Sequence, residues 1–176
     1  QAIAAGARFQ DGTAFAGVEK TGDGVVVATT RGVFRTRYVV GADGVFSAVR
    51  RAVFGRSLVS YAPAVEALVP VAPDRMARFG SRVLFDFGGM SRGYGWIFPK
   101  KDHLNVGIYS IYPVHSIRAE LARFMSRYAV LDSPSQVRCL GSSIPLKNRR
   151  AEFERDHVLL VGDAAGAVSP LTAGGL

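Results

Sequence analysis

The stretch His157–Leu176, HVLLVGDAAGAVSPLTAGGL, determines how the rest of the chain is interpreted. Its apolar run Val158–Val161 is typical of a parallel strand that is covered on both faces. The run leads straight into Gly162 and Asp163, at the position where open α/β sheets bind their ligands. A carboxylate there can accept hydrogen bonds from a sugar or polyol, and the glycines allow a close approach of the backbone to the ligand. An ordinary strand–turn–helix, with glycines that serve packing, is the alternative interpretation.

A second stretch, RYVVGADGVFSAVRR at Arg37–Arg51, repeats this pattern. Its apolar strand ends at Asp43 and Gly44, and Ser47 can cap the helix that follows. An Asp-Gly turn alone is weak evidence. Two strands that both end beside an acidic residue and a glycine, far apart in the chain, are hard to assign to chance.

Composition limits the possible classes of protein. A length of 176 residues with 48% hydrophobic residues suits one folded domain or slightly more. The net charge of +8 comes from scattered arginines, which we interpret mostly as a solvated basic surface. The single cysteine and three widely spaced histidines predict neither a disulfide nor a metal site. With no secretory signal pattern, these features favour a cytoplasmic protein.

The order of sequence patterns predicts an α/β domain that is interrupted by an antiparallel sheet. Residues 2–9 read as a helix tail, and the runs 14–20, 24–30 and 33–43 read as an antiparallel meander that ends at Asp43-Gly44. Residues 61–111 read as successive strands joined by short loops, and residues 116–128 as an amphipathic helix. The expected domains are residues 1–56, residues 57–150 and, returning to the first domain, residues 151–176.

Three motifs carry a resemblance to a known family. VVGADGVFSAVRR (39–51) resembles the Asp-Gly fingerprint of flavin-dependent oxidoreductases with the glutathione-reductase-type FAD fold, and the stretch 158–176 resembles their Gly-Asp fingerprint. Between them, YGWIFPKKDHLNVGIY (94–109) is similar to the Tyr-x-Trp-x-Phe-Pro motif of the geranylgeranyl reductase family. The first two motifs are shared with aromatic hydroxylases and halogenases. Only the third points to the prenyl reductases.

The resemblance implies a fold class and a cofactor. The class is α/β plus antiparallel β: a partial glutathione-reductase-type FAD-binding domain, interleaved with an antiparallel-sheet substrate domain. It further implies that Asp163 binds the ribityl chain of FAD, that Gly175 and Leu176 lie against the flavin ring, that Asp43 sits near the flavin, and that Ala14 passes the adenine end. The cofactor-binding residues expected on this basis are Ala14, Asp43, Gly44, Gly162, Asp163, Gly174, Gly175 and Leu176.

The third motif also has a physical interpretation. Side chains alternate along a strand, so Tyr94, Trp96 and Phe98 share one face, whereas Gly95 and Ile97 share the other. Three aromatic rings in a row can form a wall of an elongated apolar cavity, although aromatic residues more simply pack a core. With the family resemblance, the expected substrate-binding residues are Tyr94, Trp96, Phe98, Pro99 and Gly107. The chain departs from the family pattern at Ala173 and Tyr109, where glycine is usual.

The implied activity is the saturation of carbon–carbon double bonds in a geranylgeranyl or polyprenyl group on a lipid or tetrapyrrole. Reduced flavin would deliver the hydride, and protein residues would position the substrate. The expected partners are this prenylated substrate, a nicotinamide or ferredoxin as electron donor, and, as an option, a membrane surface bound peripherally. No residue is named as the catalytic acid or base.

Two alternatives differ in testable features. A flavin-dependent monooxygenase or halogenase would keep Asp43 and Asp163 but not the motif Tyr94–Pro99. A basic nucleic-acid-binding module would interleave clustered basic and aromatic residues, whereas the aromatic residues here lie in apolar strands, so no nucleic acid is expected. The hydrolase-like pattern GMSRG, Gly89–Gly93, lies between two predicted strands and is interpreted as a hairpin.

The Gly-x-Gly-x-x-G turn that takes the pyrophosphate in such FAD domains does not occur in this chain. We therefore expect these residues to be an internal segment of a longer protein. On its own, the segment is expected to bind FAD weakly or not at all and to be inactive.

Overall fold

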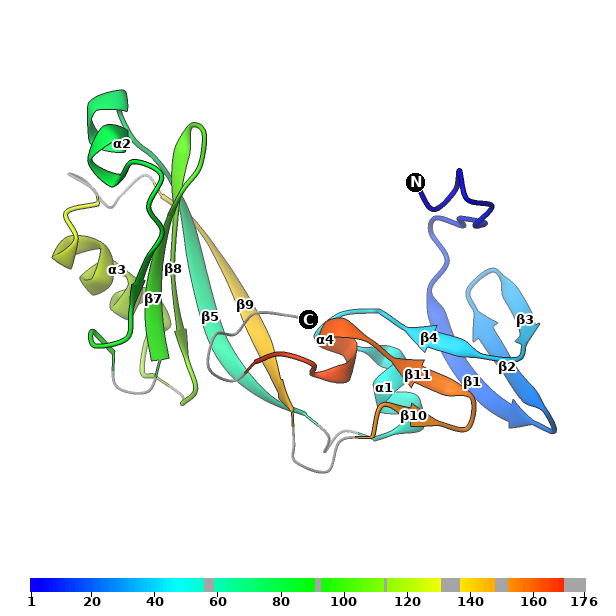
Figure 1. Ribbon diagram of the computed structural model, residues 1–176. Coiled ribbons are helices and arrows are strands. Elements are labelled where there is room, and N and C mark those ends of the chain that lie inside the picture. The colour runs from blue at the N-terminus through cyan, green and yellow to red at the C-terminus, as the bar shows by residue number, and fades with distance from the viewer. Residues whose placement is uncertain (56–58, 91–92, 113, 131–136, 148–151, 170–176) are drawn as a thin grey trace. The chain divides into compact units, whose positions relative to one another are not determined.

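The computed structural model describes residues 1–55, 59–90, 93–112, 114–130, 137–147 and 152–169 (Figure 1). The chain divides into two compact units, which are described here separately. The first unit holds Gln1–Val59 and resumes at Lys147, and the second holds Ser60–Leu146.

The first unit contains an antiparallel sheet of three strands in chain order: β1 (Phe15–Thr21), β2 (Gly24–Thr29) and β3 (Gly32–Thr36). Two-residue turns join the strands: Gly22-Asp23 forms the first, a typical hairpin turn, and Thr30-Arg31, followed by Gly32, forms the second. The predicted meander is therefore present over these strands.

The prediction that residues 33–43 form one strand is wrong. The run divides after Thr36, and its second half forms β4 (Val39–Gly41), which pairs in parallel with β11 (Val158–Leu160). A short strand β10 (Glu154–Arg155) pairs antiparallel with β11 and completes this second sheet. The run divides because Val39 takes a partner from the far end of the chain: its N–H donates to the carbonyl of His157.

The prediction of a helix tail at residues 2–9 is also wrong. Residues 2–6 form turns, with one helical hydrogen bond from the Ala5 N–H to the Gln1 carbonyl. Gly6 has a φ of 91°, which ends any right-handed turn there. All side chains of this segment are exposed, so no packing compensates the entropy of ordering a helix.

Two short helices complete the first unit: α1 (Ala48–Val53) and α4 (Gly162–Ala165). Ser47 caps α1 as predicted, because its hydroxyl accepts a hydrogen bond from the Arg50 N–H. Helix α1 packs on the two sheets through a core made of Val25, Val49, Phe54, Val158, Leu160 and Ala165. This core fixes the starts of both helices relative to the strand ends that precede them.

The second unit is built on a five-stranded sheet in the order β6-β7-β8-β5-β9. Its strands are β5 (Val59–Pro70), β6 (Leu84–Asp86), β7 (Gly93–Pro99), β8 (His103–Ser110) and β9 (Arg138–Lys147). Strand pairs β6–β7, β7–β8 and β8–β5 are antiparallel, as the sequence predicted.

Helices α2 (Pro73–Phe79) and α3 (Ile117–Arg127) belong to the second unit. Helix α3 was predicted, and Ser116 caps it by accepting from the Ala119 N–H. Helix α2 was not predicted, since the sequence was interpreted as strands joined by short loops. Seven residues are too few for a clear amphipathic period, although Pro73 in the first turn is a typical helix start.

One face of the five-stranded sheet packs against α3. Leu121, Phe124 and Met125 of this helix join a core with Val65, Ala67, Val69, Ile97, Leu104, Val106, Ile108 and Val130. A Cβ at Gly95 would overlap the Phe124 ring, so the glycine lets helix and sheet approach closely. The opposite face of the sheet carries a row of aromatic side chains, described below.

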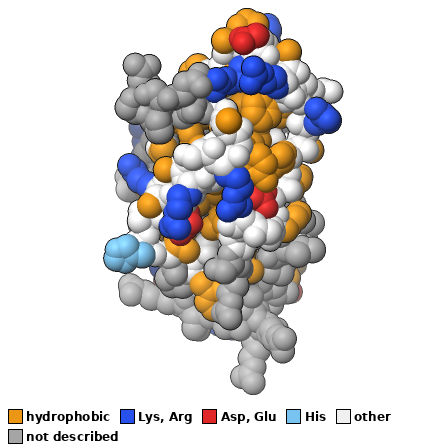
Figure 2. Space-filling model, turned by 90° about the vertical axis from the view of Figure 1, so that its left-hand side faces the viewer, with side chains coloured by type: hydrophobic (Ala, Val, Ile, Leu, Met, Phe, Trp, Pro, Cys, Tyr) orange, Lys and Arg blue, Asp and Glu red, His pale blue; other side chains and the backbone are white. Residues whose placement is uncertain are grey.

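Figure 2 shows the side of the molecule that carries α2 and α3, where Lys and Arg side chains lie among hydrophobic ones. Arg123 and Arg127 of α3 form ion pairs with Glu120 and Asp86. The basic residues on this helix are thus partly neutralised by local partners. No helix in the described part of the chain combines the length and hydropathy that crossing a bilayer requires.

Candidate functional site

The two predicted strand ends lie side by side in the first unit. Leu160 of β11 is in register with Gly41 of β4, and the Val161 N–H donates to the Gly41 carbonyl over 3.1 Å. Because the strands are parallel, both carboxyl ends point to the same edge of the sheet. Asp43 and Asp163 follow within a few residues, so the fold brings the two acidic turns to one edge.

The carboxylate of Asp43 caps helix α1. It accepts hydrogen bonds from the Ser47 hydroxyl at 2.5 Å, the Ala48 N–H at 2.7 Å and the Val49 N–H at 3.1 Å. Desolvation opposes ionisation, but the hydrogen bonds from Ser47 and the helix N–H groups outweigh it and lower the pKa of Asp43. Asp43 is therefore an ionised cap at neutral pH, and its place near a flavin stays a prediction.

The carboxylate of Asp163 is placed differently. Asp163 lies in the first turn of α4, and its side chain is exposed and accepts no hydrogen bond from the described residues. Beside it, Gly162 has a φ of 55°, and a Cβ there would meet no atom within 4 Å. The glycine thus meets a backbone requirement, and the space next to the turn is open. A polyol hydroxyl could reach this carboxylate without displacing a partner among the described residues.

Arg50 joins the two acidic turns. Its side chain is only 2% exposed, and its guanidinium donates to the carbonyls of Ala164 at 2.6 Å, Asp163 at 3.4 Å and Val45 at 2.8 Å. The interpretation of the arginines as a solvated surface is therefore wrong for this residue. Ser47, Arg50 and Phe54 are all buried and follow the i, i+3, i+7 spacing of one helix face, a signal that could have identified it.

Of the other residues predicted to bind the cofactor, the structure describes Ala14 and Gly44. Ala14 precedes β1 and exchanges hydrogen bonds with Thr30, from its N–H to the Thr30 hydroxyl and from the Thr30 N–H to its carbonyl. Gly44 has a φ of 77°, which the turn after Asp43 requires of a glycine. Gly174, Gly175 and Leu176 lie outside the described residues, so their assignment stays a prediction.

The predicted aromatic row is present on β7. Tyr94 and Trp96 have ring centroids 5.8 Å apart, and those of Trp96 and Phe98 are 6.1 Å apart. Ile97 belongs to the core on the opposite face, as the alternation predicted. By the same alternation Pro99 follows Ile97 onto that opposite face, and its role in substrate binding stays a prediction.

Three further rings, which sequence reasoning missed, extend the row. Tyr109 of β8 lies 5.5 Å from Tyr94, and Phe85 of β6 lies 5.3 Å from Phe98. Phe87 stacks on Phe85 at 6.1 Å. Tyr94 and Tyr109 are buried, but Phe85 and Phe87 are 46% and 56% exposed. We name these six residues the aromatic face: Phe85, Phe87, Tyr94, Trp96, Phe98 and Tyr109.

A chain of polar contacts lies on the aromatic face. The Trp96 indole N–H donates to the side-chain oxygen (Oδ1) of Asn105 at 2.8 Å, and the side-chain NH2 of Asn105 donates to the Glu66 carboxylate at 2.9 Å. Gly107, predicted as a substrate-binding residue, lies under Trp96, because a Cβ at this position would overlap the indole ring. Asn105 and Glu66 were not predicted, since single polar residues in apolar strands carry no distinctive sequence signal.

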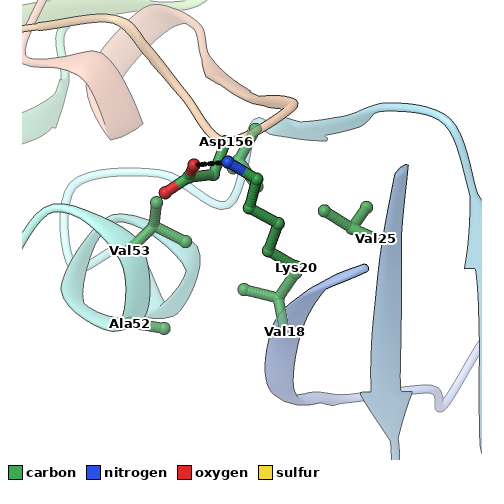
Figure 3. Close-up of a pocket in the computed structure, with 7 residues that line it drawn as sticks. Val18, Lys20, Val25, Ala52, Val53 and Asp156 are labelled. Carbon is green, nitrogen blue, oxygen red and sulfur yellow. Dashed lines mark hydrogen bonds and ion pairs between the residues drawn. The ribbon is translucent and has the colours of Figure 1, made fainter. Parts of the chain in front are cut away.

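A separate hollow of about 180 Å³ lies at the amino end of β11 in the first unit (Figure 3). Val25 and Val158 are among the apolar residues that line it. Lys20 and Asp156, which also line it, form an ion pair 2.6 Å apart (Figure 3). Asp163 follows the opposite end of the same strand. This hollow contains none of the predicted site residues.

The pattern GMSRG has the expected hairpin context. Strands β6 and β7 flank it and pair antiparallel, with Leu84 in register with Ile97. A nucleophile elbow requires a helix after the turn, which β7 replaces. Ser91 itself lies outside the described residues.

Comparison with known proteins supports a family assignment. No protein-family model matches the chain. Digeranylgeranylglycerophospholipid reductase 3 of Methanosphaera stadtmanae is 31% identical over 188 residues, which cover 99% of this chain and 46% of that protein. Geranylgeranyl diphosphate reductase of Rhodobacter capsulatus is 30% identical over 148 residues, which cover 80% of this chain and 36% of that protein. The chain thus spans less than half the length of these curated relatives.

Solved structures share the fold at lower sequence identity. A geranylgeranyl bacteriochlorophyll reductase-like protein of Thermoplasma acidophilum matches 93% of this chain and 44% of its own, with a TM-score of 0.68 and 23% identity. A flavin-dependent halogenase matches 99% of this chain and 34% of its own, with a TM-score of 0.67 and 18% identity. The fold is therefore common to reductases and halogenases, whereas the sequence identity extends to the named reductases. On this evidence the chain belongs to the geranylgeranyl reductase family.

Proposed function

We propose that the whole protein is a flavin-dependent oxidoreductase that saturates carbon–carbon double bonds in a geranylgeranyl or longer prenyl group. The observation that carries this proposal is the identity of 31% over 99% of the chain to a digeranylgeranylglycerophospholipid reductase. The aromatic face gives the proposal a physical basis, because a polyprenyl chain needs an extended apolar wall.

FAD is the cofactor in this proposal, and Asp163 is its main ligand in the chain. The carboxylate is exposed and unpartnered among the described residues, and the turn at Gly162 leaves open space. These features suit a residue that accepts hydrogen bonds from the ribityl hydroxyls. FAD, once reduced, supplies the hydride for the reaction. Arg50 holds the backbone of the Asp163 turn, and Asp43 stabilises the neighbouring turn as the cap of α1.

The domain proposal assigns residues 1–56 and 151–176 to a glutathione-reductase-type FAD-binding domain and residues 57–150 to a substrate domain inserted between them. Two observations support it. The compact units divide near these bounds, at Val59–Ser60 and Leu146–Lys147. The parallel pair β4–β11 also joins segments from both sides of the inserted domain.

The substrate proposal places the prenyl chain on the aromatic face. Tyr94, Trp96 and Phe98 would contact its methyl and alkene carbons, and the exposed Phe85 and Phe87 would extend the wall. A lipid or a tetrapyrrole could carry the prenyl group. The electron donor is a nicotinamide or a ferredoxin in this proposal, and a cytoplasmic protein would meet its lipid substrate at the membrane surface.

A second candidate is a flavin-dependent halogenase or monooxygenase, which the structural similarity to a halogenase favours. That chemistry would use the same strand ends but would need a pocket for an aromatic substrate and access for dioxygen. The aromatic row at Tyr94–Phe98 favours the reductase, since it offers a long wall instead of a compact pocket.

Anaerobic reduction of the whole protein tests the two candidates. The flavin is reduced without oxygen and is then mixed with a geranylgeranyl lipid. The proposal expects the oxidised flavin spectrum to return and the lipid to gain a pair of hydrogens for each double bond that disappears. Reoxidation by dioxygen alone, together with halogenation or hydroxylation of an aromatic compound, would reject the reductase and support the second candidate.

A further inference from the structure

The polar chain on the aromatic face crosses three strands of the second unit. Trp96 lies on β7, Asn105 on β8 and Glu66 on β5. Trp96 and Glu66 are both in register with Gly107, one from each side, whereas Asn105 is two positions away on the same face as Gly107. The two hydrogen bonds therefore run diagonally around the glycine, within the reach of diagonal cross-strand neighbours.

The chemistry of these three side chains allows one orientation of the central amide. An indole N–H can only donate, and an ionised carboxylate can only accept. Asn105 must therefore present its oxygen to Trp96 and its nitrogen to Glu66, as the contacts of 2.8 and 2.9 Å have it. A residue with only donors or only acceptors could not satisfy both neighbours. The amide is thus fixed from one side by Glu66 and fixes the indole on the other.

Gly107 supplies the space that the indole occupies. Atoms of the six-membered ring of Trp96 lie where a Cβ of residue 107 would be, so any larger residue would displace the ring. The neighbouring rings Tyr94 and Phe98 contact Trp96 only through apolar ring contacts, which tolerate several geometries. The hydrogen bond to Asn105 is the directional contact of this ring.

We propose that Asn105 and Glu66 are positioning residues that hold the indole of Trp96 across Gly107 and thereby shape the wall on which the prenyl chain lies. This inference rests on the proposed function for its substrate, but the position of the indole can be measured without any substrate. Asn105 and Glu66 act through Trp96.

The test uses Asn105→Leu in the whole protein, with fluorescence and steady-state kinetics as readouts. Trp96 is the single tryptophan of the 176-residue chain, so the difference in emission between each variant and its Trp96→Phe counterpart isolates its signal. Loss of the hydrogen bond should shift this emission and make the Trp96 indole more accessible to a neutral quencher. The KM for a geranylgeranyl lipid should rise up to about tenfold, the upper range for one neutral hydrogen bond. The kcat and the flavin content should change much less.

Two substitutions test Glu66: one removes the acceptor oxygen, and the other keeps it. Glu66→Leu leaves the Asn105 amide without its acceptor and should reproduce the fluorescence change. Glu66→Gln keeps an acceptor oxygen and should restore the emission and most of the KM. If both substitutions have equal effects, or if neither changes the emission, the positioning role of Glu66 is rejected.

Two glycine substitutions, one on each face of the sheet, test whether the fluorescence change is specific to Trp96. Gly107→Ala should displace Trp96 and change its emission, whereas Gly95→Ala should displace Phe124 on the opposite face and leave the emission near that of the wild type. Unchanged Trp96 emission and KM in Asn105→Leu would overturn the inference even if Gly107→Ala fails to fold. A wild-type protein that turns over no prenyl substrate would instead reject the proposed function, while the fluorescence would still decide the positioning of Trp96.

Discussion

The ends of strands β4 and β11 have similar sequences but use their aspartates differently. Both strands are apolar, and a glycine and an aspartate follow each. Asp43 accepts three hydrogen bonds from the start of α1, whereas Asp163 accepts none from the described residues. One carboxylate stabilises the start of a helix, and the other is exposed.

The distance from each aspartate to its helix explains the difference. Asp43 precedes α1 by a loop that includes Gly44, so its side chain can fold back onto the N–H groups of Ala48 and Val49. Asp163 is already inside the first turn of α4, and its carboxylate accepts no hydrogen bond from the described residues. A Gly-Asp or Asp-Gly motif is therefore not sufficient to identify a ligand-binding carboxylate, because its position relative to the helix decides its role.

Removal of Arg50 should have the largest effect on both strand ends. Arg50→Met leaves the carbonyls of Val45 and Ala164 without their buried donor, so the free energy of unfolding should fall by about 2–3 kcal/mol. Chemical denaturation of the whole protein measures this loss, and flavin affinity should fall with it. The neighbouring Arg51→Met, which removes an exposed hydrogen bond to the Phe46 carbonyl, is the control, and an equal loss in both variants would show that burial of the Arg50 contacts adds no stability.

Asp163→Ala should separate ligand binding from stability. A charge-assisted hydrogen bond to a ribityl hydroxyl contributes roughly 1.5–3 kcal/mol, so the Kd for FAD should rise about 10- to 150-fold. The free energy of unfolding without flavin should change by less than about 0.5 kcal/mol, because the side chain is exposed and has no partner among the described residues. Asp163→Asn, which keeps a neutral acceptor, should have an intermediate Kd. Unchanged flavin content and affinity in folded Asp163→Ala would refute the assignment.

Asp43→Ala should show the opposite pattern. Loss of the cap should lower the free energy of unfolding by about 1 kcal/mol, the usual effect of removing a helix N-terminal cap. Flavin affinity should fall less than in Asp163→Ala, and flavin titration measures it. If the loss in free energy of flavin binding exceeds the loss in free energy of unfolding, Asp43 also acts on the flavin, as the family resemblance implies.

The smallest effect is the pH dependence of the Asp43 cap. Desolvation raises the pKa of Asp43, but the hydrogen bonds from Ser47 and the α1 N–H groups outweigh it, so the folded-state pKa lies below the unfolded value of about 3.9. The stabilisation is therefore complete above about pH 5 and is lost as the pH falls through the folded-state pKa.

Denaturation at several pH values measures this dependence. The difference in the free energy of unfolding between wild type and Asp43→Asn should be constant from about pH 8 to pH 5 and should shrink below about pH 4. A difference that stays constant through acid pH would mean that the cap does not depend on the carboxylate charge.

Local patterns in the sequence predicted much of the fold. The hairpins of β1–β3, the cap Ser47, the helix α3 and the alternation along β7 are all present. Each depends on residues a few positions apart, whose propensities and spacing are visible in one stretch of sequence. The family followed from three such stretches.

The failed predictions concern features that depend on distant partners or on weak local signals. The division of residues 33–43 follows from the pairing of β4 with β11, which lies near the other end of the chain. Helix α2 is too short for its period to be recognised. Arg50 resembled other scattered arginines, because its three carbonyl partners come from turns that only the fold brings together.

The sequence by itself determined the family, the strand ends that carry Asp43 and Asp163, and the face that Tyr94, Trp96 and Phe98 share. Only the tertiary structure decided which aspartate is used as a helix cap, and that Asn105 and Glu66 hold Trp96 over Gly107. The physical reason is the separation along the chain over which each interaction acts. Periodicity and capping arise between residues within about one or two helical turns, whereas hydrogen bonds between strands and turns depend on how the chain closes on itself.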